Sequence, residues 1–210
     1  MIICPVDYDW ILAGDVYMAA LIENEHNPES VKVVEVDFSG GVIKPITGIN
    51  EELRISIIGH GSPGTYNEII ASSFIQKLHK MGLDENYQGT IEYYTCDSAL
   101  NRNEGTDDSL AYLTKNIFKS ARVIGAQGSS IIGYDKCRYI VDQSFESEAS
   151  QLQSNLLNNH NFSEIINIDK SVFDKGKAVR DKKEVKTFYD NFIRQLKERN
   201  YLINGLSYLV

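Results

Sequence analysis

The sequence lacks any long run of apolar residues. About 18 consecutive apolar residues are needed for a helix to cross a bilayer, and no stretch of the 210 residues approaches that length. The opening residues, Met1–Val6, have neither the basic segment nor the extended apolar segment of a secretory signal peptide. We therefore expect no membrane span, and we interpret this opening segment as a first β-strand.

Cysteine is scarce. The chain has three cysteines, Cys4, Cys96 and Cys137, which cannot all pair within one molecule. No two of them form a C-x-x-C motif, so the sequence supports neither a zinc ribbon nor a thioredoxin-type motif, and we expect no metal site. A reducing compartment suits this use of cysteine best.

Positive charge is scarce in the first half of the chain. Residues 1–110 hold 6 basic and 18 acidic residues, a net of −12, whereas residues 111–210 have a net of +4. Non-specific nucleic-acid binding is therefore not expected. The basic excess is concentrated in one short run, which would either bind a polyanion or form a solvated loop and helix start: Lys175, Lys177, Arg180, Lys182, Lys183 and Lys186.

Short apolar runs alternate with helical patterns along the chain, and this alternation predicts an α/β fold with a mostly parallel sheet. The predicted strands are rich in β-branched residues, and three of them are apolar enough to be covered on both faces. They are Ile2–Val6, Val31–Phe38, Ile55–Ile58, Ile91–Thr95 and Val123–Ala126.

The predicted helices show apolar residues at three- and four-residue spacing. The helix Glu68–Met81 is expected to end before Gly82, and the helix beginning at Asp107 is expected to be capped by Thr106. The full set is Asp15–His26, Glu68–Met81, Asp107–Lys119, Ser144–Asn158 and Glu184–Tyr201. The length suits one domain, residues 1–210, with a core over residues 1–135 and a variable flank over 136–210.

Two side chains with catalytic chemistry follow neighbouring predicted strands. His60 comes directly after the strand at Ile55–Ile58, and Cys96 comes directly after the strand at Ile91–Thr95. The predicted helix between them fits a crossover, so both strands would end at the same edge of a parallel sheet, where open α/β sheets place their sites. We therefore expect His60 and Cys96 to lie close together.

Such a pair suits nucleophilic catalysis. A thiol reacts as its thiolate, and a neighbouring imidazole both favours the thiolate and later protonates the leaving group. The backbone amides of Gly61 and Cys96 are candidates for an oxyanion hole. Alone, Cys96 would more often be a buried core thiol and His60 a residue capping a strand; the combination favours catalysis.

The order strand–His-Gly, helix, strand–Cys and small-residue strand resembles that of caspases, legumains, gingipains and clostripain. The sequence is most similar to the autoprocessing cysteine peptidase domain of MARTX toxins and large clostridial glucosylating toxins. The resemblance covers about residues 1–135 and rests on four segments: the first strand with Asp7-Tyr-Asp9 and an alanine-containing helix, His26–Asp37, Leu53–Gly61 and the strand to Cys96.

The resemblance implies a caspase-like three-layer sandwich with helices on both faces of the sheet. It implies that Asp9, or Asp7 in its place, orients the histidine, and that inositol hexakisphosphate activates the protein by binding basic residues. No other cofactor is implied. The wall of the pocket for the residue before the cleaved bond would come from Tyr94, Gln127, Gly128, Ser129 and Ser130. Because this wall carries no carboxylate, we expect no preference for a basic residue, unless Asp97 or Asp135 turns inward.

The sequence therefore predicts a cysteine endopeptidase that cleaves a polypeptide in cis or in trans. A bacterial toxin or effector module is expected, secreted or delivered into a reducing host cytosol, with the bacterial cytoplasm as the alternative. Two other functions stay open: a catalytically idle caspase-like domain that binds a partner through the same cleft, and a thiol acyltransferase that uses the same dyad.

Overall fold

The computed structural model describes residues 1–39, 42–158, 170–203 and 208–209. These residues form two compact units that interleave along the chain. The first unit contains residues 1–7, residues 32–128 and a short strand at Tyr208–Leu209. The second contains the described residues of 8–31 and 129–203. The predicted boundary near residue 135 therefore lies close to one unit boundary, but the segment 8–31 belongs with the C-terminal part of the chain.

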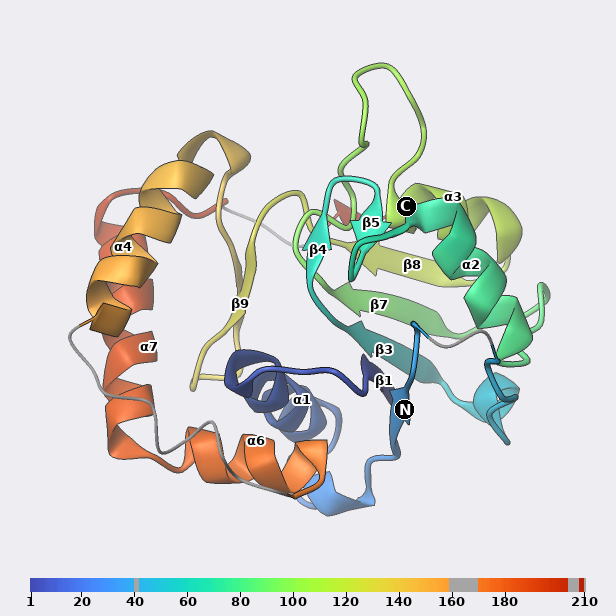
Figure 1. Cartoon of the computed structure of the whole chain (residues 1–210), viewed down its shortest axis with the longest axis horizontal. Helices are drawn as coiled ribbons and strands as arrows, with labels where there is room; N and C mark the ends of the chain where they lie inside the picture. Colours follow the sequence, from blue (N-terminus) through green and yellow to red (C-terminus); the bar gives the residue numbers. More distant parts are fainter. Residues whose placement is uncertain (40–41, 159–169, 204–207, 210) are drawn as a thin grey trace. The chain divides into compact units, whose positions relative to one another are not determined.

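A six-stranded sheet forms the centre of the first unit, in the order β11-β8-β7-β3-β1-β2 (Figure 1). Five of the strands run parallel, and β11 pairs antiparallel with β8 at one edge. All five predicted strands are present within two residues of their expected ends. Their bounds are β1 Ile2–Pro5, β2 Val33–Val36, β3 Arg54–Ile58, β7 Thr90–Tyr94, β8 Arg122–Gly125 and β11 Tyr208–Leu209.

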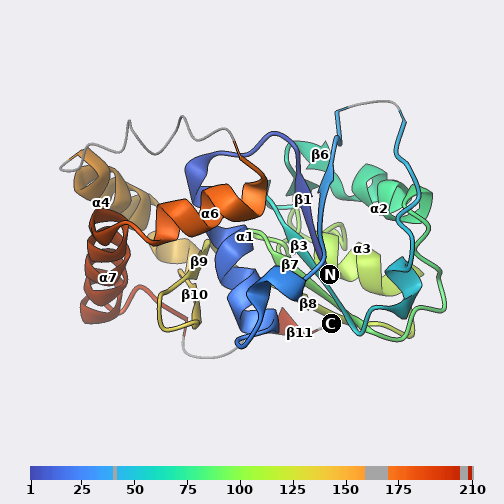
Figure 2. The ribbon, with the colours of Figure 1, turned by 90° about the horizontal axis from the view of Figure 1, so that it is seen from below.

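Helices α2 (Ala71–Lys80) and α3 (Leu110–Ile117) lie together against the sheet (Figure 2). Alternate residues of β3, β7 and β8 pack with both helices in one apolar core. The intervening residues of β1 and β3, such as Cys4 and Ile58, are also fully buried, as expected for strands covered on both faces. The predicted mostly parallel α/β sheet flanked by helices is confirmed.

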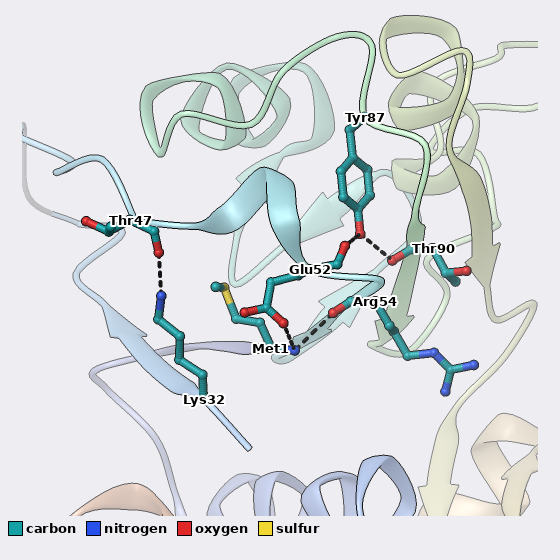
Figure 3. A network of polar contacts seen from close by, with 7 residues as sticks. All are labelled: Met1, Lys32, Thr47, Glu52, Arg54, Tyr87 and Thr90. Carbon is teal, nitrogen blue, oxygen red and sulfur yellow. Dashed lines mark hydrogen bonds and ion pairs between the residues drawn. The ribbon is translucent and has the colours of Figure 1, made fainter. Parts of the chain in front are cut away.

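The amino ends of β1, β3 and β7 are joined by a polar network (Figure 3). The Met1 nitrogen donates to the Arg54 carbonyl at 2.9 Å and to Glu52 Oε2 at 3.3 Å. The Tyr87 hydroxyl donates to the Glu52 carbonyl at 2.8 Å and, at 3.4 Å, to that of Thr90. These contacts fix the strand ends opposite to the edge at which His60 and Cys96 were predicted.

A small three-stranded antiparallel sheet follows β3. It comprises β4 (Gly61–Ser62), β5 (Thr65–Tyr66) and β6 (Ile69–Ile70). The prediction that a helix begins at Glu68 was therefore wrong; α2 begins at Ala71. Asn67 and Glu68 have φ angles of 44° and 66°, in the left-handed region, and a right-handed helix cannot include them.

Helix α3 also begins later than predicted. Its N-cap is Ser109, whose hydroxyl accepts from the Tyr112 N–H at 3.2 Å, so the prediction of Thr106 as the cap was wrong. Asn101 Oδ1 accepts from the N–H groups of Asp108 and Ser109, at 3.2 and 3.0 Å. These bonds hold the residues before Leu110 in a loop.

The second unit is mainly helical. Helix α1 starts five residues earlier than predicted because Asp9 caps it, with Oδ1 accepting from the Leu12 N–H at 2.8 Å. Two features were not predicted from the sequence: the β9–β10 hairpin and helix α6. The elements of the second unit are α1 Trp10–Glu23, the short 3-10 helices η1 Pro28–Ser30 and η3 Gln143–Phe145, β9 Ser130–Ile132, β10 Arg138–Ile140, α4 Glu146–Asn158, α6 Val172–Arg180 and α7 Lys183–Glu198. One more 3-10 helix, η2 Ile49–Glu51, belongs to the first unit.

Helices α1 and α6 cross closely in both views (Figures 1 and 2). The contact needs Gly176, because a β-carbon there would overlap the Ala13 carbonyl. Arg180, at the end of α6, is 3% exposed and pairs with Asp15 at 2.8 Å. Its guanidinium also lies 3.8 Å from the centre of the Tyr189 ring, an arrangement typical of a buried, structural arginine.

Candidate active site

The pairing of β3 with β7 places His60 and Cys96 at one edge of the sheet. The two strands run parallel, and Ile58 pairs with Tyr94. His60 and Cys96 each follow two residues after this pair. The chain segments also touch beyond the strands, because a β-carbon at Gly61 would collide with the Thr95 methyl group and the Cys96 carbonyl oxygen. The sequence-predicted juxtaposition is therefore present at the level of the backbone.

The backbone around His60 is fixed by the last residue of β5, Tyr66, and by the residue that follows it, Asn67. The His60 N–H donates to Asn67 Oδ1 at 2.8 Å, and the Asn67 N–H donates to the His60 carbonyl at 2.9 Å. The buried Tyr66 hydroxyl donates to the Ile58 carbonyl at 3.0 Å. Sequence analysis missed Tyr66 and Asn67, which lie six and seven positions after the histidine.

The N–H of Gly61 is oriented away from β5. Gly61 pairs with Tyr66, and the bond from Asn67 to the His60 carbonyl flanks that pair. In an antiparallel ladder a pair flanked in this way does not exchange its own hydrogen bonds. The amide that was predicted to stabilise an oxyanion is thus not used by the β4–β5 ladder.

Cys96 lies in a tight turn after β7. The residue after it, Asp97, has a φ angle of 55° and is buried. Ser98 is fully buried; its hydroxyl donates to the Thr95 carbonyl at 3.0 Å and accepts from the Ala126 N–H at 2.9 Å. Sequence analysis missed Ser98 as the residue that joins the cysteine turn to the end of β8.

The cysteines of the chain form no disulfide with one another. Cys4 is buried in β1, and burial, reinforced by the charge of Glu35, raises the pKa of its thiol to about 12. Cys137 is exposed and Cys96 is half-buried. Among the three, Cys96 combines partial access with a histidine on the neighbouring strand end.

A cavity of about 800 Å³ opens beside His60 within the first unit. It lies outside the carboxyl ends of β1, β2 and β3. Because β2 and β3 extend the sheet to opposite sides of β1, the cavity lies at the topological switch point, where open α/β sheets bind ligands. Its described walls are Pro5–Asp7, Val36–Ser39, His60–Ser62, Thr65 and Asn67–Ile69.

The structure separates the two candidate acids. Asp7 lines the cavity together with His60. Asp9 caps helix α1 in the second unit. Of the two, Asp7 is therefore the one that shares a described pocket with the histidine.

The predicted substrate-binding residues are divided between the units. Tyr94 is buried at the end of β7, and the Gly128 carbonyl accepts from the Asp97 N–H at 3.1 Å, beside the cysteine turn. Ser129 and Ser130 belong to the second unit, where their hydroxyls bond to Glu146 and Arg138. None of these residues, nor Gln127, is among the described residues that line the cavity beside His60.

The basic run 175–186 is partly engaged in ion pairs. Besides Arg180 with Asp15, Lys177 pairs with Glu29 at 3.4 Å, and Lys186 pairs with Asp190 on α7. Lys175 lies 5.3 Å from the Tyr8 ring centre. Lys182 and Lys183 are exposed at the start of α7.

The described residues contain neither a metal-binding cluster nor a membrane-spanning helix. No cluster of three or more histidine, cysteine or acidic side chains there has the arrangement of a metal site. None of the described helices has the length and apolar character required to span a bilayer.

Compared with known proteins, the chain matches no protein-family model and no curated protein sequence.

Proposed function

We propose that this protein is a cysteine endopeptidase of the caspase-like fold, with Cys96 as nucleophile and His60 as its proton-transfer partner. The observation that carries the proposal is the pairing of Ile58 with Tyr94 at the ends of two neighbouring parallel strands. His60 follows Ile58 by two positions, and Cys96 follows Tyr94 by two positions. The sheet supports the caspase-like assignment because it is mostly parallel. Five neighbouring strands run parallel, and only the edge strand β11 is antiparallel.

In the proposed reaction the Cys96 thiolate attacks the carbonyl carbon of the scissile peptide bond. The resulting oxyanion accepts hydrogen bonds from the N–H groups of Gly61 and Cys96. The His60 imidazolium protonates the leaving amine as the C–N bond breaks, which yields an acyl-enzyme. His60 then takes a proton from water, and the water hydrolyses the thioester to release the acid and restore the thiol. Asp7 is the proposed acid that orients His60, in place of Asp9.

The proposed setting is a self- or partner-cleaving toxin or effector module that works in a reducing compartment. Inositol hexakisphosphate is proposed as its activator, through the exposed Lys182 and Lys183. The ion pairs of Arg180, Lys177 and Lys186 within the second unit make these three residues less available to a polyanion.

The test combines a thiol-reactive peptide probe with a peptide-library digest, both on the full chain. The proposal requires probe labelling at Cys96 that depends on His60, and cleavage of peptide bonds by the wild-type protein. Labelling without cleavage, but with acyl transfer to an added amine, would identify a thiol acyltransferase. No labelling of Cys96 at all would leave a catalytically idle domain.

A further inference from the structure

The cavity beside His60 has acidic residues on three of its walls. Asp7 follows β1, Asp37 follows β2 and Glu68 precedes β6. No lysine or arginine is among its described lining residues. Three carboxylates around one pocket repel an anionic ligand and attract a cationic one.

The remaining walls are largely apolar. Val36 and Ile69 are half-buried, and the Phe38 ring is buried against Tyr66 and Phe74 at centroid distances of 5.2 and 5.5 Å. A cavity lined by both apolar side chains and carboxylates matches a ligand with an apolar stem and a positively charged tip. Arginine and lysine side chains have this form, because their methylene chains bury while the charged group stays near polar partners.

We infer that this cavity binds an arginine or lysine side chain of the polypeptide substrate. The inference rests on the proposed peptidase function, and it replaces the expectation that a basic residue is disfavoured. That expectation considered walls at Tyr94 and residues 127–130, which do not line this cavity. A bound metal ion is the weaker reading, because these carboxylates form no metal-binding group among the described residues.

One of the carboxylates is held in place by its neighbours. Asp37 Oδ1 accepts from the Ser39 N–H at 2.9 Å and from the Ser39 hydroxyl at 2.7 Å. A carboxylate fixed in this way needs less ordering when a cation binds.

The binding test uses the full chain with Cys96→Ala and two matched probes, Nα-acetyl-arginine amide and Nα-acetyl-citrulline amide. The probes have nearly the same shape and differ in charge. By NMR titration at low salt, we expect the arginine probe to bind at least about tenfold more tightly, as for a charge-assisted hydrogen bond. Equal affinity for both probes would overturn the inference.

Neutralising each carboxylate identifies the residues responsible. Asp7→Asn, Asp37→Asn and Glu68→Gln should each weaken the arginine probe about two- to fivefold, as expected for exposed charge pairs, and leave the citrulline probe unchanged. Glu85→Gln is the matched control, because Glu85 is exposed and lies outside the described walls of the cavity. If the triple variant Asp7→Asn/Asp37→Asn/Glu68→Gln keeps the wild-type affinity for the arginine probe, the probe binds to another surface.

A digest separates this inference from the proposed function. Wild-type cleavage enriched in arginine or lysine at one subsite, with that enrichment reduced in the double variant Asp37→Asn/Glu68→Gln, which keeps the proposed orienting acid Asp7, supports both. Cleavage without any basic preference keeps the peptidase and removes the basic pocket. Selective arginine binding without any cleavage keeps the pocket and removes the peptidase.

Discussion

Asn67 is hydrogen-bonded to both backbone polar groups of His60, through its side-chain oxygen and its own N–H. Its φ angle of 44° lies in the left-handed region, which asparagine adopts more readily than most residues. The candidate catalytic histidine is therefore positioned not by β3 alone but also by Asn67, which directly follows β5 and lies seven positions later in the chain.

We predict that Asn67 acts on Cys96 through His60. Asn67→Gly keeps the left-handed backbone but removes the acceptor for the exposed His60 N–H, and should destabilise the fold by about 0.5–1.5 kcal/mol. If His60 promotes the Cys96 thiolate, the pH midpoint of Cys96 alkylation should rise toward about 8.5 in this variant. Asn67→Asp keeps the acceptor and should retain the wild-type midpoint. An unchanged midpoint in Asn67→Gly would give Asn67 a purely structural role.

The second prediction concerns the dyad itself. Cys96→Ala and His60→Ala should each unfold near the wild-type temperature, because Cys96 is only half-buried and His60 is exposed. Peptidase activity should fall by several orders of magnitude, as for other deletions of a nucleophile or its base. Thermal unfolding and the library digest measure the two effects. Cys137→Ala is the matched control, and full activity in Cys96→Ala would remove the nucleophile assignment.

The sequence predicted the sheet well because its strands carry a strong local signal. β1 and β3 are largely apolar, β-branched runs, so their positions depend little on tertiary context. The parallel arrangement of β3 beside β7 was predicted from the order of the elements, which brought His60 and Cys96 to one edge; the residue-by-residue register comes from the structure.

Other features depend on contacts that are distant in sequence. Tyr66, Asn67 and Ser98 act through hydrogen bonds to residues on other elements, and no local pattern signals them. The basic run that includes most of helix α6 was interpreted as a polyanion-binding segment or as a solvated loop and helix start. The helix forms because Gly176 lets it pack closely on α1. The carboxylates at the cavity come from three separate segments that only the strand order brings together.

The third prediction concerns the polyanion. We expect any stabilisation by inositol hexakisphosphate at low salt to depend on the exposed Lys182 and Lys183, because a compact point charge near water is accessible to phosphate. The double variant Lys182→Glu/Lys183→Glu should abolish the thermal shift. Lys44→Glu is the matched control for the change of charge, because Lys44 is an exposed lysine of the first unit. Lys115→Glu would not serve, because the Lys115 ammonium donates to the Ala121 carbonyl. A shift that persists in the double variant would exclude this site.

The fourth prediction concerns alkaline stability and rests on Cys4. Burial raises the pKa of the Cys4 thiol from 9.0 to about 12 in the folded protein. In the unfolded chain the thiol ionises near its ordinary value, so between pH 9 and pH 12 the unfolded state binds fewer protons than the folded state. The stabilisation is therefore fully present below about pH 9 and is lost as pH rises toward 12.

The expected slope is a loss of up to about 1.4 kcal/mol in the free energy of unfolding for each pH unit above 9. Urea unfolding at pH 7.5, 8.5, 9 and 10 measures it. Tyrosines whose pKa burial raises above the ordinary 10.0 lose stability in the same direction near pH 10, so the part that belongs to Cys4 is the difference between wild type and Cys4→Ala. Cys4→Ala should lower stability by about 1 kcal/mol below pH 9, for the lost packing, and should lose less stability than wild type above pH 9 because the titrating thiol is gone. Cys137→Ala should keep the wild-type slope, because that thiol is exposed. If Cys4→Ala and wild type lose stability in parallel above pH 9, the buried thiol is not the group that titrates.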